Sequence, residues 1–158
     1  MKRLGAIFAA VLVIMLSTSV FAANPSTLSA SEAGNAVDLI VVKKPETKNS
    51  ATTKKTYGIT GTGKNGVTVA YYKFNGSTYS ALKTSGGEIS QTKIGNAGVF
   101  YKQVSLNEGQ NRFAVRAESP NGAFQIVYFD INVLNNRILD NASGFTSIIK
   151  SLYNGWIK

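Results

Sequence analysis

Residues 111–119, NRFAVRAES, alternate apolar and polar side chains almost without a break. A period of two is the side-chain period of a β-strand, and a helix would need a period of 3.6. The stretch therefore predicts a strand with one face buried and the other in water. The face expected to be buried carries Phe113, Val115 and Ala117, which alternate with Arg112, Ala114, Arg116 and Glu118.

Other stretches of the chain resemble strands, and turn residues separate them. Residues 66–74, GVTVAYYKF, are rich in the β-branched and aromatic residues that strands prefer. Asn75-Gly76 follows, a dipeptide that favours a tight hairpin. With about seven strands, the pattern predicts a mainly β, antiparallel two-sheet sandwich. The expected strands are 37–43, 56–63, 66–74, 77–83, 99–106, 111–119 and 123–134, with a short one near Ile89.

Two stretches depart from this pattern of half-buried strands separated by short turns. Residues 43–55, KKPETKNSATTKK, hold five lysines and no large apolar residue, which predicts a solvated connection between strands. The lysines would serve solubility, with a docking site as the alternative. The last strand is apolar on both faces in its first half, which indicates either a bulge or cover by another element.

A corner is predicted at residues 107–110, NEGQ. Gly109 can adopt the positive φ that a chain crossing between sheets requires. Asn111 can hydrogen-bond the backbone across the turn. Leu106 and Phe113 would then anchor the two flanking strands in the core.

Two turn motifs stand out: Ile59, Gly61, Gly66 and Val69 fit an I-x-G-x-x-x-x-G-x-x-V pattern, and Leu106, Gly109, Asn111 and Gly122 fit an L-x-x-G-x-N corner with a later Gly turn. In these motifs the chain resembles the bacterial immunoglobulin-like domains of secreted and cell-surface proteins. The resemblance covers residues 37–134 and is carried by turn motifs, so it implies an immunoglobulin-like fold and says little about function. The terminal helix predicted below departs from the family pattern.

The start of the chain resembles a secretory signal peptide. Lys2 and Arg3 precede a thirteen-residue uncharged run, and small residues precede an expected cut near Ala22 or Ala23. An uncleaved anchor is the alternative, but a membrane span needs roughly 20 residues. Residues 1–23 would be removed and 24–36 would form a flexible lead-in. We expect a protein that is secreted or held at the cell envelope, and the composition favours a bacterial source.

The tail, residues 135–158, changes period. Its apolar residues are spaced by four and three, which predicts an amphipathic helix over about 144–156. The helix would pack on the sandwich, dock another protein or lie on a membrane surface, and its few lysines disfavour the last alternative. Its partner-facing residues would be Phe145, Ile149, Leu152 and Trp156.

The chain contains no histidine and no cysteine. This excludes Ser-His and Cys-His nucleophile pairs, zinc sites of the usual kind and disulfides. Paired carboxylates or a Ser-Lys dyad stay open as routes to a small hydrolase, but no motif marks either. No phosphate-binding loop, cofactor motif or nucleic-acid motif is present. We therefore predict a non-enzymatic protein without a cofactor.

Binding remains as the expected function, in adhesion, assembly or accessory binding at the bacterial cell envelope. The partner would be another envelope protein or an anionic cell-wall polymer. Aromatic rings stack on sugars and lysines pair with anionic groups, so a glycan module is the alternative, although core and half-buried strand positions are the favoured interpretation of these side chains. The residues of this Tyr/Lys face are Tyr71, Tyr72, Lys73, Tyr79, Lys83, Tyr101 and Lys102.

Overall fold

The computed structural model describes residues 24–134, and these form a mainly β structure with no helix among them. The predicted β class is confirmed. The strands are β1 (Thr27–Leu28), β2 (Ile40–Lys44), β3 (Asn49–Thr52), β4 (Thr56–Gly63), β5 (Thr68–Phe74), β6 (Tyr79–Ala81), β7 (Gln91–Lys93), β8 (Val99–Ser105), β9 (Gly109–Glu118) and β10 (Phe124–Val133).

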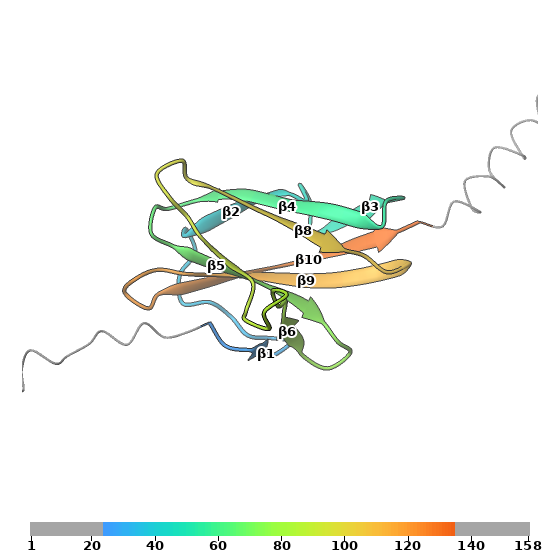
Figure 1. Ribbon diagram of the computed structural model, residues 1–158, viewed down its shortest axis with the longest axis horizontal. Helices are drawn as coiled ribbons and strands as arrows, with labels where there is room; N and C mark the ends of the chain where they lie inside the picture. The colour runs from blue at the N-terminus through green and yellow to red at the C-terminus, as the bar shows by residue number, and fades with distance from the viewer. Residues whose placement is uncertain (1–23, 135–158) are drawn as a thin grey trace, which may run out of the picture.

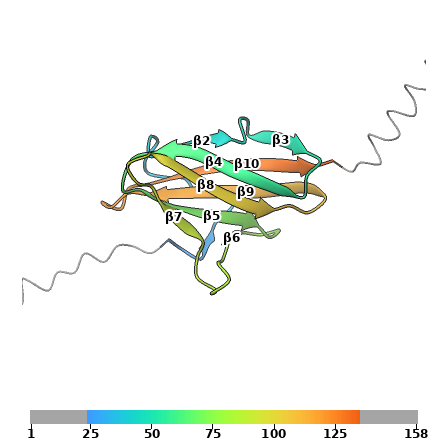
Figure 2. The ribbon, with the colours of Figure 1, turned by 45° about the horizontal axis from the view of Figure 1, so that its top comes forward.

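The strands form two sheets that lie in two layers (Figures 1 and 2). The larger sheet has seven strands in the order β1-β6-β5-β9-β10-β3, with β7 also paired to β5. The smaller sheet has the order β2-β4-β8. All pairs are antiparallel except β3 with β10, which is parallel.

The lysine-rich stretch 43–55 contains a strand, where the sequence predicts only a connection. Its first residues end β2 in the smaller sheet, and β3 then joins the larger sheet beside β10. Asp130 N donates to Lys48 O at 2.7 Å and Leu134 N donates to Thr52 O at 2.8 Å. Backbone bonds hold this edge strand, so it needs no large apolar side chain and the hydrophobic pattern does not reveal it.

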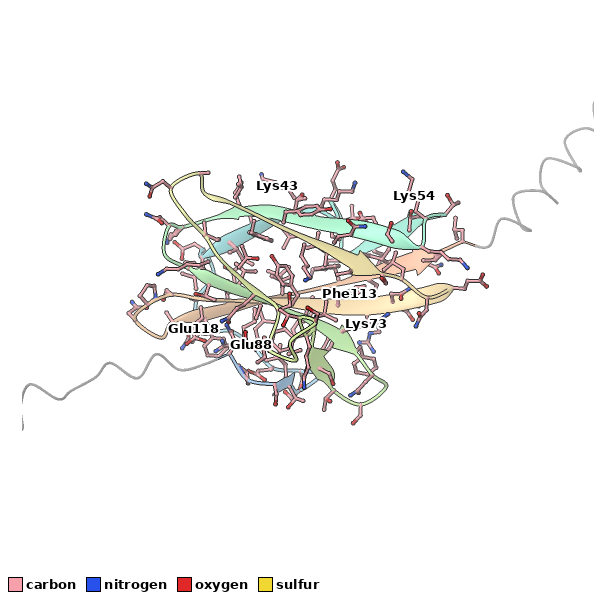
Figure 3. The ribbon with its side chains drawn as sticks, viewed as in Figure 1. Lys43, Lys54, Lys73, Glu88, Phe113 and Glu118 are labelled. Carbon is pink, nitrogen blue, oxygen red and sulfur yellow. The ribbon has the colours of Figure 1, made fainter. Side chains whose placement is uncertain are left out.

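The main core lies between the two sheets. Ile59 of β4 and Phe100 of β8 meet Val69, Phe113 and Val115 of the larger sheet in one buried cluster. Figure 3 shows Phe113 in the interior of the molecule, with Lys43 and Lys54 on the side of the smaller sheet. The alternation of 111–119 therefore correctly predicts the residues that face this core.

Close packing of the sheets explains one glycine of β4. A Cβ on Gly61 would lie 2.4 Å from Val41 O and 2.4 Å from Phe100 Cζ. No side chain fits at that distance, so the backbone of β4 can approach its neighbours only with glycine at this position.

The predicted corner before β9 is confirmed. Gly109 has a φ of +79°. The Asn111 side chain accepts a hydrogen bond from Asn107 N at 2.9 Å and donates to Asn107 O at 2.7 Å. Leu106 and Phe113 are both buried in the main core, as expected.

Part of the outer face of the larger sheet is also buried, because residues 24–36 lie across it. We call this segment the strap. Leu28 of the strap is 1% exposed in a second cluster with Tyr72, Tyr79 and Ala114. The structure thus differs from the flexible lead-in that the sequence predicts, since bonds such as Ala36 N to Phe124 O hold the strap in place.

The strap also explains why the second half of the outer face of β9 is not in water. Arg116 is 7% exposed and Glu118 is 8% exposed, where alternation predicts a solvated face. Phe124 and Ile126 of β10 are half-buried, which agrees with the alternative that another element covers the first half of this strand.

Two predicted elements lie outside the described residues. These are the signal peptide at 1–23 and the helix at 144–156 with Phe145, Ile149, Leu152 and Trp156. Among residues 24–134, no helix has the length and apolar character to cross a membrane.

Candidate binding groove

The outer face of the larger sheet carries a groove near the β3 edge. The register of β9 with β10 places Arg112 opposite Asp130, and the pairing of β5 with β6 places Phe74 opposite Tyr79. The groove has a volume of about 350 Å³. Its lining residues are Ala30, Lys48, Asn49, Tyr79, Arg112, Tyr128, Phe129 and Asp130.

Aromatic rings support the groove from below. The ring centroid of Tyr79 lies 5.1 Å from that of Phe74 and 5.0 Å from that of Tyr128. The Tyr128 hydroxyl donates to Glu32 O of the strap at 2.8 Å. The strap thus fixes one aromatic wall, and Ala30 of the same segment lines the groove directly.

A charged pair lies over these rings. The Arg112 guanidinium stacks 4.3 Å from the centroid of Phe74, and its Nε lies 3.8 Å from Asp130 Oδ1. Gln110 Nε2 also donates to Asp130 Oδ2 at 2.8 Å. The side chains of Arg112 and Asp130 are 41% and 28% exposed, so both can still contact a ligand.

The charges of the groove come from its basic and acidic side chains, because its phenols stay neutral at physiological pH. Burial raises the pKa of Tyr79, an effect that Arg112 partly offsets, and burial also raises the pKa of Tyr128. Lys48 is exposed at the edge of the groove and adds a second cation beside Arg112.

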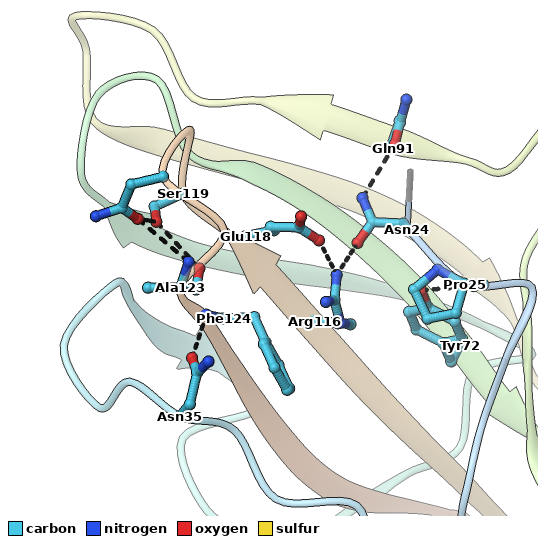
Figure 4. A network of polar contacts seen from close by, with 11 residues as sticks. Asn24, Pro25, Asn35, Tyr72, Gln91, Arg116, Glu118, Ser119, Ala123 and Phe124 are labelled. Carbon is cyan, nitrogen blue, oxygen red and sulfur yellow. Dashed lines mark hydrogen bonds and ion pairs between the residues drawn. The ribbon is translucent and has the colours of Figure 1, made fainter. Parts of the chain in front are cut away.

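A second polar cluster on the same sheet face is closed by the strap (Figure 4). Arg116 pairs with Glu118, and its Nη1 donates to Asn24 Oδ1 at 2.6 Å. The guanidinium lies 4.4 Å from the Phe124 ring centroid, and Asn24 Nδ2 donates to Gln91 Oε1 at 3.1 Å. The cluster ties the first described residue to the sheet.

The cluster contains one orphan donor. Arg116 Nε is buried and has no hydrogen-bond partner among the described residues. A missing partner at a buried donor costs stability, but the other contacts of Arg116 hold the guanidinium in place. This cluster therefore joins the strap to the sheet and offers no open site.

The predicted Tyr/Lys face does not form one surface. Tyr71 is fully buried in the main core, with its hydroxyl 3.4 Å from Thr92 Oγ1. Tyr72 is fully buried on the opposite face, where its hydroxyl donates to Pro25 O at 2.9 Å. Adjacent strand residues point to opposite faces, and in β5 both faces are covered.

The other members of that predicted face are also separated. Tyr79 lies in the second cluster and is the one member that lines the groove. Tyr101 is exposed on the smaller sheet, and Lys83 is exposed beyond β6. Lys73 and Lys102 are half-buried on different sheets.

Sequence reasoning missed Arg112, Tyr128, Asp130 and Lys48 as site residues. The alternating pattern places Arg112 on the outer face of its strand. Its pairing with Asp130 depends on the register between β9 and β10. The position of Lys48 depends on β3, which carries no hydrophobic signal. No local motif could have joined these four residues.

The described residues offer little for metal chemistry. Within 24–134, no group of three or more His, Cys, Asp or Glu side chains is placed to hold a metal ion. The groove instead combines stacked rings, two cations and one carboxylate, which suits recognition of a polar ligand.

No protein-family model matches the chain. A comparison with curated proteins likewise finds no significant match. Inference about function therefore depends on the fold and the groove.

Proposed function

We propose that this protein is an exported, non-enzymatic, immunoglobulin-like binding module of the bacterial cell envelope, acting in adhesion, assembly or accessory binding. The observation that carries the proposal is the groove, which Arg112, Asp130 and Lys48 line together with Tyr79 and Tyr128. Stacked aromatic rings with a few polar groups are typical of binding sites.

The strand arrangement supports the immunoglobulin-like part of the proposal. Immunoglobulin-like domains pack two antiparallel sheets with connections that cross between them. Here the first long strand belongs to the smaller sheet as β2 and continues into the larger sheet as β3. Strands β5, β9 and β10 form the centre of the larger sheet, and β4 and β8 pair opposite them.

An anionic glycan of the cell wall is the ligand class that we favour for the groove. Lys48 belongs both to the groove and to the lysine-rich stretch 43–55, which includes the end of β2 and all of β3. Because β3 is held in the larger sheet beside β10, this stretch reaches the groove through Lys48, directly before β3. An extended anionic polymer could contact both. The lysines of this stretch are Lys43, Lys44, Lys48, Lys54 and Lys55.

Binding to isolated bacterial envelopes tests the proposal. We expect the purified protein to be retained and Lys48→Glu to reduce retention, because the change reverses a charge at the groove. Lys83→Glu is the matched control, since Lys83 is also exposed but lies outside the groove. Equal retention of both variants, or no retention of the parent protein, would contradict a groove-based binding function.

A second binding experiment distinguishes an anionic glycan ligand from a protein partner. Purified anionic wall polymer should retain the protein at low salt and release it at moderate salt, because exposed charge contacts are screened within about 10 Å at 0.1 M salt. The partner would instead be an envelope protein if the polymer did not retain the protein and if protease treatment of the envelopes abolished retention.

A further inference from the structure

The outer face of the smaller sheet carries a cluster of exposed apolar side chains. Val41, Val99 and Tyr101 are 54%, 58% and 58% exposed. The strand register places Val41 and Val99 on either side of Thr62, and it pairs Tyr101 with Thr60. The three side chains therefore belong to one surface, which we call the outer apolar face.

The middle of the outer apolar face is recessed relative to the apolar side chains around it. Strand β4 contributes Thr56, Gly58, Thr60 and Thr62 to it, and a Cβ on Gly58 would lie 2.8 Å from Tyr101 Cε2. The Tyr101 ring thus lies over the backbone of β4. The strands β2, β4 and β8 contain no acidic residue. A shallow, uncharged centre between apolar side chains can accommodate a helix with an apolar face.

The apolar side chains on the other sheet faces of the described residues already have cover. The inner faces of both sheets enclose the main core, and the strap covers the apolar part of the outer face of the larger sheet. Among residues 24–134, the remaining exposed large hydrophobic residues are Val37 and Leu134, and neither belongs to a sheet face.

The end of the described chain lies beside this face. Leu134 N bonds to Thr52 O, and β4 begins four residues after Thr52. The start of β4 is paired with the end of β8, where Thr56 lies opposite Ser105. Residues 135–143 can span up to about 30 Å when extended. Tyr101 is four residues from Ser105, or about 13 Å along the strand.

We propose that residues 144–156 form a helix that docks on the outer apolar face. The spacing of Phe145, Ile149, Leu152 and Trp156 gives one apolar stripe, which an isolated helix of this length would leave in water. The face lies within reach of the chain and offers matching apolar side chains. This inference is independent of the groove, which lies on the other sheet.

Cross-linking tests the location of this helix. The chain has no cysteine, so two introduced cysteines are the only thiols with which a maleimide can react. We expect a short bis-maleimide to link Val99→Cys with Ile149→Cys within one molecule. Thr27→Cys with Ile149→Cys is the control, because Thr27 is equally accessible but lies on the strap. Equal yields in the two proteins would overturn the proposal, and linked dimers alone would identify a second copy as the occupant.

Fluorescence gives a second readout, because Trp156 is the one tryptophan of the chain. Docking predicts blue-shifted native emission that moves to longer wavelength in Val99→Lys. Val37→Lys, at a residue 88% exposed outside the face, should leave the emission unchanged. If Trp156 in the native protein emitted at the wavelength typical of a tryptophan exposed to water, this result would contradict docking. A blue shift that appears only with anionic phospholipid vesicles would assign the helix to a membrane surface instead.

Discussion

Asn111 stabilises the corner before β9 with a single buried side chain. Its Nδ2 donates to Asn107 O and Gly109 O at 2.7 and 3.0 Å, and its Oδ1 accepts from Asn107 N at 2.9 Å. We predict that Asn111→Ala lowers the free energy of unfolding by about 1–3 kcal/mol, because these backbone groups lose their partner. Urea denaturation followed by circular dichroism measures the loss. Asn107→Ala keeps the backbone contacts and should have little effect, so equal losses would argue against this role.

The corner could be predicted because its chemistry is local. Gly109 and Asn111 act on groups within a few residues, and turn chemistry can be inferred from such short stretches. Tyr71 and Tyr72 could not be placed in the same way. Each is buried by a different layer, and nothing in residues 66–74 indicates that both faces of that strand are covered.

Tyr72 makes the free energy of unfolding depend on pH in the alkaline range. Burial raises the pKa of its phenol from 10.0 to about 12, with a partly offsetting effect of Arg116. The folded protein therefore holds the phenolic proton more tightly than the unfolded chain does. This contribution is complete below about pH 10 and is lost as the pH rises toward about 12, because only the unfolded chain ionises easily in that window.

We accordingly predict that unfolding free energy falls between about pH 10 and pH 12, and that Tyr72→Phe makes the fall less steep. Phenylalanine cannot ionise, although it also loses the hydrogen bond to Pro25 O. Denaturation midpoints across this pH range give the slope for each protein. An identical slope in Tyr72→Phe would show that Tyr72 does not carry the dependence.

At the scale of elements, the strap acts as a structural part of the domain. Leu28 is 1% exposed in the second cluster, while its neighbour Thr27 is exposed. We predict that Leu28→Ala costs about 2–4 kcal/mol, because it leaves a cavity under the strap. Chemical denaturation measures the cost, and Thr27→Ala should be nearly neutral. If Leu28→Ala were also neutral, the strap would be the loose lead-in that its composition suggests.

The strands that the sequence predicts best are those with strong patterns of their own. The predicted stretches 56–63 and 99–106 nearly coincide with β4 and β8, since β-branched and aromatic residues make up more than half of each strand. The strap and β3 are different. Small polar residues dominate them, and they are fixed by hydrogen bonds to distant strands, as with Asn35 Oδ1 and Phe124 N at 2.7 Å. Such partners are visible only after the sheet has formed.

At the scale of the whole molecule, the groove shows what a sequence pattern cannot supply. It combines the strap, the start of β3, β6, β9 and β10, which are far apart along the chain. The two-sheet architecture follows from patterns within each strand. The position of Lys48 beside Arg112 follows only from the crossing of β3 into the larger sheet.

The open edge of the smaller sheet raises the question of self-association. Strand β8 lies at this edge, and an edge strand can pair with another chain. In β8, Phe100 and Val104 are buried, and Lys102 lies between them on the same face and is half-buried. A lysine directed inward on an edge strand disfavours such pairing, because a second strand would bury its charge.

We therefore predict that Lys102→Val increases self-association, because it turns β8 into an apolar edge. Sedimentation velocity at rising protein concentration measures the degree of self-association. Lys83→Val is the control, because it removes the same charge outside β8. Association in Lys102→Val alone would support protection by this lysine. Equal association in both variants would attribute the effect to net charge. If both variants stayed monomeric, another feature would protect the edge. The first feature to test is the helix that we place on the outer apolar face, by deleting residues 143–158 in the Lys102→Val background.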